Sequence, residues 1–179
     1  MIDMNALSTK AKTIKLLLLD VDGVLTDGKL YFSNEGHEMK AFNTLDGHGI
    51  KMLRKSGVEV GIITGRTSKL VEKRAGDLGI HLLIQGREDK YKALMDMLEA
   101  FPCPLENIAF MGDDYPDLAV MTKVGLSLCV KNAHAEVAGR SDWQSRNNGG
   151  EGAVREACDM LMKAQGTFDL ALEKYIDGI

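Results

Sequence analysis

The sequence predicts an α/β fold in which a doubly wound parallel sheet carries helices on both faces. Short apolar runs alternate with stretches in which apolar residues recur at helical spacing, as in chains that build parallel sheets. Several of these runs end directly in acidic or hydroxyl residues, which is where ligand-binding side chains lie in such sheets. A length of 179 residues, with 45% hydrophobic residues, is enough for one core, so we expect a single domain over residues 1–179.

The predicted strands are short apolar runs bounded by polar residues or glycine. In chain order they lie at Ile14–Leu19, Val58–Ile63, His81–Ile84, Ile108–Met111 and Val124–Leu128. Helices are predicted between or after them. They are a helix that follows a loop at Asp46–Gly49 and ends near Lys55, then Ser68–Leu78, Glu88–Ala100, Ala153–Ala164 and Phe168–Tyr175.

Between the first two strands, the sequence predicts a small β-hairpin insertion. Gly28–Ser33 and His37–Phe42 are short runs on either side of Asn34–Gly36, which is a typical turn sequence. The rest of the interval to the second strand holds one predicted helix.

Composition excludes several classes of partner. The net charge is −4 and no basic stripe is visible, so we expect no nucleic acid partner. No apolar stretch is long enough to cross a membrane, and the first apolar run is too short for a secretion signal. The three cysteines show no CxxC spacing, which is typical of a reducing compartment. We therefore expect a cytoplasmic protein.

Four short segments carry the residues that we expect to form the active site. They are Asp20-Val-Asp22-Gly23, Thr64-Gly65-Arg66, the isolated Lys90, and the segment from Gly112 to Asp117 that contains Asp113 and Asp114. Three of these segments directly follow a predicted strand. Because the carboxyl ends of parallel strands meet at one edge of the sheet, these side chains should converge on one small volume.

These residue types suit phosphoryl transfer. One carboxylate of the Asp20 and Asp22 pair can attack phosphorus while the other gives and then takes a proton. An anionic nucleophile needs positive charge between itself and a phosphate, and Asp20, the backbone carbonyl of Asp22 and Asp113 offer the hard oxygen ligands that Mg²⁺ prefers. Thr64 can donate a hydrogen bond to a phosphate oxygen, and Lys90 can neutralise further charge.

Each segment taken alone also has a simpler interpretation. A lone DxDG is often a polar turn after a strand, a lone lysine usually lies on the surface, and the acidic segment from Asp113 to Asp117 could merely cap a helix. Arg66 could bind a substrate carboxylate in a bidentate manner or pair with a surface acid, and both interpretations stay open. The four segments together, in this order at successive strand ends, favour an enzyme.

These motifs, as they stand, resemble those of the haloacid dehalogenase superfamily of phosphohydrolases, whose fold is Rossmann-like. The resemblance implies that Asp20 is the nucleophile and Asp22 the general acid and base. It implies roles in phosphate binding for Thr64, Gly65 and Lys90. It also implies that Asp113 binds the metal with support from Asp114 and Asp117.

The intervals between the motifs leave no room for a cap domain. Asp20 to Thr64 holds only the hairpin and one helix, and Thr64 to Lys90 holds a helix, a strand and a turn. A capless site is open to water unless something covers it. We expect neighbouring subunits to do so. The glycine-rich segment Gly149–Gly152 is either a mobile cover or simply a loop, and the need of a capless site for a cover favours the first interpretation.

From about Lys15 to Gly166 the sequence is similar to one capless family, the 3-deoxy-D-manno-octulosonate 8-phosphate phosphatases. The resemblance implies that a sugar-acid phosphate is hydrolysed to the free sugar acid for lipopolysaccharide synthesis. It also implies a homotetramer with the hairpin near Leu30–Phe42 at its centre and the C-terminal tail of one subunit at a neighbour's site. The matching segments include Asp20–Gly28, Asp46–Lys51, Ile63–Ser68, Met111–Asp114 and Gly149–Glu156.

Two alternatives remain beside this hypothesis. The same chemistry would serve a phosphatase for a nine-carbon keto-sugar acid 9-phosphate. A protein of a different class, a non-catalytic oligomerisation scaffold, is disfavoured because Asp20, Asp22 and Lys90 are all present.

Overall fold

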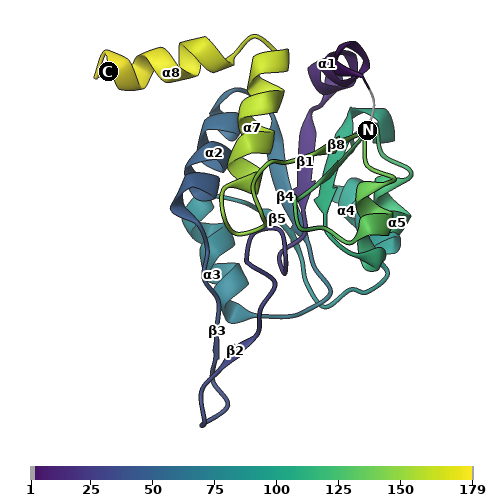
Figure 1. Cartoon of the computed structure of the whole chain (residues 1–179), viewed down its shortest axis with the longest axis vertical. Helices are drawn as coiled ribbons and strands as arrows, with labels where there is room; N and C mark the ends of the chain where they lie inside the picture. Colours follow the sequence, from purple (N-terminus) through teal and green to yellow (C-terminus); the bar gives the residue numbers. More distant parts are fainter. Residues whose placement is uncertain (1–2, 179) are drawn as a thin grey trace.

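The centre of the computed structural model, which describes residues 3–178, is a six-stranded sheet with the order β5-β4-β1-β6-β7-β8 (Figure 1). All of its neighbouring strands run parallel. The predicted parallel α/β sheet is therefore confirmed, with one further edge strand, β8, that the sequence did not predict. The strands are β1 Leu16–Leu19, β4 Glu59–Ile63, β5 Leu82–Ile84, β6 Ile108–Gly112, β7 Leu126–Cys129 and β8 Trp143–Gln144.

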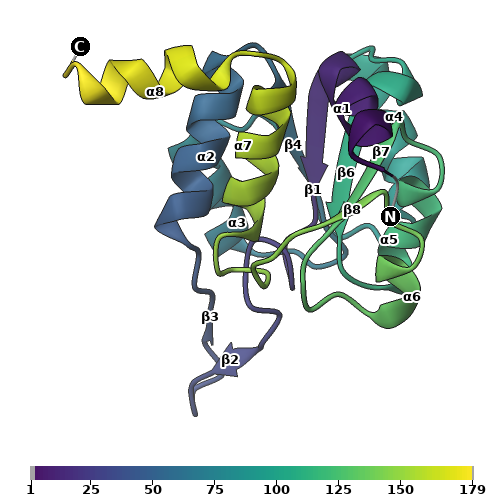
Figure 2. The same ribbon diagram turned by 45° about the horizontal axis from the view of Figure 1, so that its top comes forward.

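Helices cover both faces of this sheet (Figure 2). All four leucines of β1 are buried, because each face of this central strand is covered. Leu17 and Leu19 pack into one core and Leu16 and Leu18 into the other. The first face carries α1 Met4–Thr13, α2 Thr44–Lys55, α3 Lys69–Leu78 and α7 Ala153–Ala164; the second carries α4 Lys90–Ala100, α5 Tyr115–Met121 and α6 Ala135–Ala138.

One helix of the structure was not predicted, and another begins earlier than expected. The N-terminal segment forms α1, capped by the side chain of Asp3, and no helix was predicted there. The loop expected at Asp46–Gly49 belongs to α2, which begins at Thr44 after the cap of Asn43. A Cβ atom on Gly49 would lie 2.7 Å from the side chain of Arg155 and 3.1 Å from its Cα, so this glycine allows α2 and α7 to approach closely.

Asp46 has a structural task inside α2. Helix α7 begins after Gly152, which has no side chain to cap it. The Asp46 carboxylate accepts a hydrogen bond of 2.8 Å from the backbone N–H of Arg155 and so replaces the missing cap.

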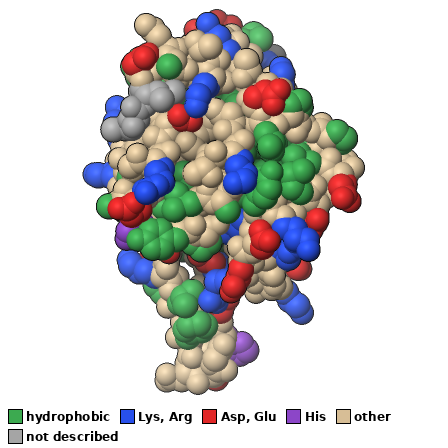
Figure 3. All heavy atoms as spheres, turned by 90° about the vertical axis from the view of Figure 1, so that its right-hand side faces the viewer, with side chains coloured by type: hydrophobic (Ala, Val, Ile, Leu, Met, Phe, Trp, Pro, Cys, Tyr) green, Lys and Arg blue, Asp and Glu red, His purple; other side chains and the backbone are tan. Residues whose placement is uncertain are grey.

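The predicted hairpin is confirmed and is shorter than expected, with β2 Tyr31–Phe32 paired antiparallel to β3 Glu38–Met39. It projects from the body beyond the carboxyl end of β1 (Figure 2). In the space-filling view the projecting lobe carries hydrophobic side chains on its surface (Figure 3). Helix α8, Phe168–Ile176, extends from the opposite end of the molecule (Figure 1).

The glycine-rich segment Gly149–Gly152 does not line the predicted site cavity, so the structure favours a simple loop over a cover. It packs against the loop that follows β1. The N–H of Gly150 donates to the carbonyl of Val24 at 2.9 Å, and a Cβ atom on Gly149 would lie 1.7 Å from the carbonyl oxygen of Gly23. Only glycine can pack so closely, and the segment therefore supports this loop.

Across residues 3–178, we find no helix with both the length and the apolar character that a membrane crossing requires.

Candidate active site

The structure brings all of the predicted site residues to one cavity at the carboxyl ends of β1, β4 and β6. The cavity has a volume of about 720 Å³. It is lined by Asp20, Asp22, Thr64, Gly65, Arg66, Lys90, Asp113, Asp114 and Asp117, together with Gly28, Glu88 and Pro116. Parallel topology thus places side chains from distant parts of the sequence in one volume.

At the bottom of the cavity lies a group of charges that we call the sheet-edge cluster: Asp20, Lys90, Asp113 and Asp117. The Nζ atom of Lys90 is 2.8 Å from Oδ1 of Asp20 and 2.6 Å from Oδ1 of Asp117. The other oxygen of Asp117, Oδ2, accepts hydrogen bonds from the backbone N–H groups of Asp113 and Asp114 at 2.9 and 3.3 Å. Both oxygens of Asp117 are therefore occupied, and this residue orients the others.

The local sequence explains why these groups are held so firmly. Asp20 directly follows β1, and its N–H donates to the carbonyl of Met111 on the neighbouring strand at 3.1 Å. Asp113 follows β6, and a Cβ atom on Gly23 would lie 2.1 Å from its carboxylate. Gly23 has φ +95°, a conformation that favours glycine, so the chain can turn tightly against Asp113.

Burial and mutual repulsion perturb these carboxyl groups. Burial, with the nearby charge of Asp117, raises the pKa of Asp20 to about 6, although Lys90 opposes the shift. Burial and the charges of Asp20 and Asp117 raise the pKa of Asp113 to about 8. Neighbouring acids in a buried site therefore resist ionisation until further positive charge is present.

This cluster fits a divalent cation. Oxygens of Asp20, Asp113 and Asp117 all lie within 4.8 Å of one another. When all three acids are ionised, they outnumber the single ammonium of Lys90 and leave an excess of negative charge, and hard oxygen donors suit Mg²⁺. Because both oxygens of Asp117 already accept hydrogen bonds, Asp20 and Asp113 are the side chains that fit direct metal contact best.

A second group of charges lies at the rim, and we call it the hairpin cluster: Asp22, Glu38, Lys40 and Arg66. Lys40 pairs with Oδ1 of Asp22 and lies 3.6 Å from Glu38. The Nη2 atom of Arg66 is 2.7 Å from Glu38, and its Nε is 3.7 Å from Oδ2 of Asp22. Arg66 thus pairs with acids of its own chain in this structure.

Sequence reasoning missed Glu38 and Lys40. One signal was available, since the two residues are two apart in a predicted strand and therefore point to the same face, opposite to Met39. Nothing in the spacing indicated which face would meet the site.

The remaining predicted residues have local roles that the structure makes clear. Thr64 is buried directly after β4, and its N–H donates to the carbonyl of Ile84 at 3.0 Å. Among residues 3–178, no atom outside Gly65 and its two chain neighbours lies within 4 Å of a Cβ built on Gly65. Asp114 is exposed and caps α5 through a 2.8 Å hydrogen bond from the N–H of Tyr115.

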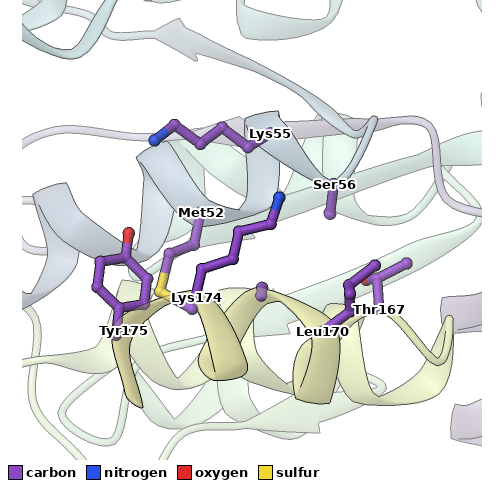
Figure 4. Close-up of a pocket in the computed structure, with 8 residues that line it drawn as sticks. Met52, Lys55, Ser56, Thr167, Leu170, Lys174 and Tyr175 are labelled. Carbon is purple, nitrogen blue, oxygen red and sulfur yellow. The ribbon is translucent and has the colours of Figure 1, made fainter. Parts of the chain in front are cut away.

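Another cavity, of about 300 Å³, lies between α2 and α8 (Figure 4). Met52 and Tyr175 lie at one end of it and Leu170 and Thr167 at the other (Figure 4). It contains no carboxylate and no member of either charge cluster, so its lining offers no comparable set of reactive groups.

Comparison with known proteins gives consistent matches. Residues 83–157 match the family model of the haloacid dehalogenase-like hydrolases. The chain is 52% identical over 162 residues to 3-deoxy-D-manno-octulosonate 8-phosphate phosphatase KdsC of Escherichia coli (strain K12), which covers 90% of this chain and 86% of that protein.

Solved structures agree. A probable YrbI family phosphatase from Pseudomonas syringae superposes with a TM-score of 0.94 at 49% identity, over 96% of this chain and 98% of that one. The 3-deoxy-D-manno-octulosonate 8-phosphate phosphatase from Moraxella catarrhalis, solved in complex with magnesium ion, phosphate ion and a KDO molecule, has a TM-score of 0.94 at 42% identity, over 97% and 99% of the two chains. This chain therefore belongs to the haloacid dehalogenase-like hydrolases, in the family of 3-deoxy-D-manno-octulosonate 8-phosphate phosphatases.

Proposed function

We propose that this protein is a Mg²⁺-dependent phosphatase that hydrolyses 3-deoxy-D-manno-octulosonate 8-phosphate to the free sugar acid and phosphate, a step in lipopolysaccharide precursor synthesis. One observation carries the proposal: Asp20 lies at the strand edge with its Oδ1 2.8 Å from the buried Lys90, and Asp22 lines the same cavity. The 52% identity to the Escherichia coli phosphatase supports the choice of substrate.

In the first step, a carboxylate oxygen of Asp20 attacks phosphorus and the bond from phosphorus to the sugar oxygen breaks. Asp22 gives its proton to that oxygen, so the sugar acid leaves as an alcohol. Lys90 offsets negative charge beside Asp20, and Thr64 and Gly65 offer donors to the phosphate oxygens.

In the second step, Asp22 takes a proton from water while the water oxygen attacks the phosphorus of the aspartyl-phosphate. The bond from phosphorus to Asp20 breaks, which releases inorganic phosphate and restores both carboxyl groups. When bound, Mg²⁺ supplies positive charge between the nucleophile and the anionic phosphate. Asp20, Asp113 and the backbone carbonyl of Asp22 would hold it, with Asp114 and Asp117 in support.

Arg66 is the best candidate to bind the carboxylate of the sugar acid. Its side chain is 46% exposed at the cavity rim, and a guanidinium can hold a carboxylate with two parallel hydrogen bonds. Glu38 accepts a hydrogen bond from Arg66 in this structure. The substrate carboxylate would displace Glu38 from Arg66 or bind Arg66 together with it.

We also propose a cytoplasmic homotetramer whose neighbouring subunits cover the open site. Large apolar side chains are exposed on the hairpin at Phe32 and Met39 and on α8 at Leu170 and Ile176. Helix α8 lies at the end of the molecule away from the hairpin and the site beside it, so its tail would reach a neighbour's site rather than its own (Figure 1). Cysteines without disulfides, two of them buried, are consistent with a reducing compartment.

The test is initial phosphate release with Mg²⁺ from a panel that holds eight-carbon and nine-carbon keto-acid phosphates and hexose phosphates. We expect the eight-carbon compound to be preferred by at least about tenfold in kcat/KM. Preference for the nine-carbon compound would keep the catalytic assignments and change the substrate. A folded protein that releases phosphate from none of them would contradict the phosphatase and favour the scaffold. Light scattering that reports a monomer at micromolar concentration would contradict the tetramer.

A further inference from the structure

The side chain of Lys40 is buried although this residue belongs to a projecting hairpin. Its side chain is only 2% exposed, whereas the side chain of Lys29 on the same insertion is 72% exposed. A buried ammonium is costly unless it is paired. Within residues 3–178, the partners of Lys40 are the carboxylates of Asp22 and Glu38, and Asp22 is the closer of the two.

Asp22 needs such a partner more than Asp20 does. Asp20 directly follows β1 and is fixed by the sheet and by Lys90, whereas Asp22 lies in the turn that follows and its side chain is 20% exposed. Lys40 binds its Oδ1, and Arg66 lies 3.7 Å from its Oδ2. The rotation of this carboxylate is thus limited from both sides by residues that lie outside its own loop.

This arrangement arises because successive side chains of the hairpin strand point to opposite faces. Glu38 and Lys40 point to the site, and Met39 between them is 60% exposed on the other face. Glu38 holds Arg66 at 2.7 Å and lies 3.6 Å from Lys40, so it connects the two cations. The hairpin therefore has one face that completes the site and one apolar face.

We infer that Lys40 is a positioning residue that fixes the carboxyl group of Asp22 for proton transfer. The inference rests on the proposed function and names a residue that the four sequence motifs do not contain. Lys40 forms no bond to substrate. It acts by keeping Asp22 aimed at the oxygen that leaves phosphorus in the first step and at the attacking water in the second.

Leaving-group chemistry separates this role from a structural one. An alkyl phosphate such as a sugar phosphate expels a poor leaving oxygen and depends on proton donation, which contributes about 10²–10⁴-fold in rate. An aryl phosphate such as 4-nitrophenyl phosphate expels a stable phenolate and needs little help. The value of kcat/KM reports steps up to departure of the leaving group, so misplacing Asp22 should slow the alkyl phosphate selectively.

The experiment compares kcat/KM of Lys40→Met with that of the unsubstituted protein on three compounds. They are the eight-carbon keto-acid phosphate, a hexose 6-phosphate that lacks a carboxylate, and 4-nitrophenyl phosphate. We expect a loss of about 10- to 100-fold on both alkyl phosphates and less than about threefold on the aryl phosphate. Lys40→Arg should recover most of the loss, and the matched Lys29→Met should change none of the three values.

Several outcomes would overturn the inference. Equal losses on alkyl and aryl phosphates would indicate a structural role for Lys40. A loss confined to the keto-acid phosphate, with a raised KM, would make Lys40 a substrate contact. No loss on any compound would remove Lys40 from catalysis.

Two controls keep the test decisive. If Lys40→Met does not fold, Lys40→Gln keeps a polar group and is compared on the same compounds with the same expected contrast. The unsubstituted protein tests the proposed function separately, because its failure to hydrolyse any of the phosphates would refute the phosphatase itself rather than the role of Lys40.

Discussion

The two charge clusters share one cavity and are built in different ways. The sheet-edge cluster is buried, with the side chains of Lys90 and Asp117 only 4% and 1% exposed, and it is anchored by strand ends and by the first turn of α5. The hairpin cluster depends on a two-stranded insertion, and its Arg66 side chain is 46% exposed. The first cluster is fixed by topology, whereas the second depends on how one insertion packs on the body.

The proposed mechanism gives the two clusters different tasks. In the proposed mechanism, bond making at phosphorus needs a nucleophile held rigidly, and the sheet edge holds Asp20 in this way with Lys90 beside it. In the proposed mechanism, proton transfer and substrate recognition involve groups at the rim. Asp22 is held there by a residue of the hairpin, and Arg66 is partly exposed and can turn toward the molecule that enters. Substitutions in the two clusters should therefore have effects of different size and kind.

The largest effect is expected at the nucleophile. Asp20→Asn should lower kcat by at least about 10³-fold, because an amide oxygen is a poor nucleophile toward phosphorus. The substitution removes a charge from a crowded acidic site, so the melting temperature should not fall by more than a few degrees. Phosphate release and thermal unfolding of the same preparation measure both quantities.

Glu38→Gln is the matched control from the hairpin cluster, and we expect its kcat to stay within about tenfold of the unsubstituted protein. A folded Asp20→Asn variant with near-normal turnover would remove Asp20 from the role of nucleophile and would erase the distinction between the clusters.

The next effect concerns stability. Asp117→Asn breaks a buried charge network, since Asp117 accepts from Lys90 and from two backbone N–H groups, and it should cost about 3 kcal/mol of unfolding free energy. Glu38→Gln weakens partly exposed pairs and should cost less than about 1 kcal/mol. Denaturant titration measures the free energy of unfolding of both variants. Mg²⁺ is present in the titration so that its charge offsets the repulsion among the acids. Equal losses of unfolding free energy in the two variants would show that the difference in burial between the clusters does not affect their contribution to stability.

The same difference decides what could be predicted from the sequence. Asp20, Thr64 and Asp113 each follow an apolar run, and parallel topology forces such strand ends together, so their convergence could be predicted without a structure. Lys40 and Glu38 lie on a hairpin whose orientation depends on distant contacts, among them the pair with Asp22. Local patterns carry no information on that orientation, and both residues were missed.

Glycines gave the least reliable predictions. Asp46–Gly49 looked like a loop and Gly149–Gly152 like a mobile cover, because glycine is common in flexible segments. In the structure, another part of the chain lies so close to Gly49 and to Gly149 that a side chain at either position would collide with it. A sequence does not distinguish glycine that permits motion from glycine that permits close packing.

Gly149→Ala should therefore disturb the loop that carries Asp22. The added Cβ would lie 1.7 Å from the carbonyl oxygen of Gly23, so the backbone must shift, and we expect a loss of about 2 kcal/mol in stability together with lower turnover. Gly76→Ala on α3 is the matched control, because its Cβ would meet nothing within 4 Å and should stabilise the helix by about 0.5–1 kcal/mol. Equal melting temperatures for the two variants would contradict the tight contact.

The smallest predicted effect is a pH dependence of metal affinity. Burial and the neighbouring charges of Asp20 and Asp117 raise the pKa of Asp113 to about 8, so without metal this carboxyl group holds a proton at pH 7. Binding of Mg²⁺ requires the carboxylate and must release that proton. The apparent dissociation constant for Mg²⁺ should therefore fall about tenfold for each pH unit gained below about pH 8 and level off above it.

Calorimetric titration with Mg²⁺ at pH 6.5, 7.5 and 8.5 measures this slope and needs no substrate. Asp113→Asn has no such proton to lose, so it should bind the ion weakly with little dependence on pH in this range. Glu38→Gln should keep the slope of the unsubstituted protein, because the hairpin cluster contributes no carboxylate side chain to the metal. A flat affinity between pH 6.5 and 8 would mean that Asp113 is already ionised, and a slope altered by Glu38→Gln would mean that the two clusters titrate as one.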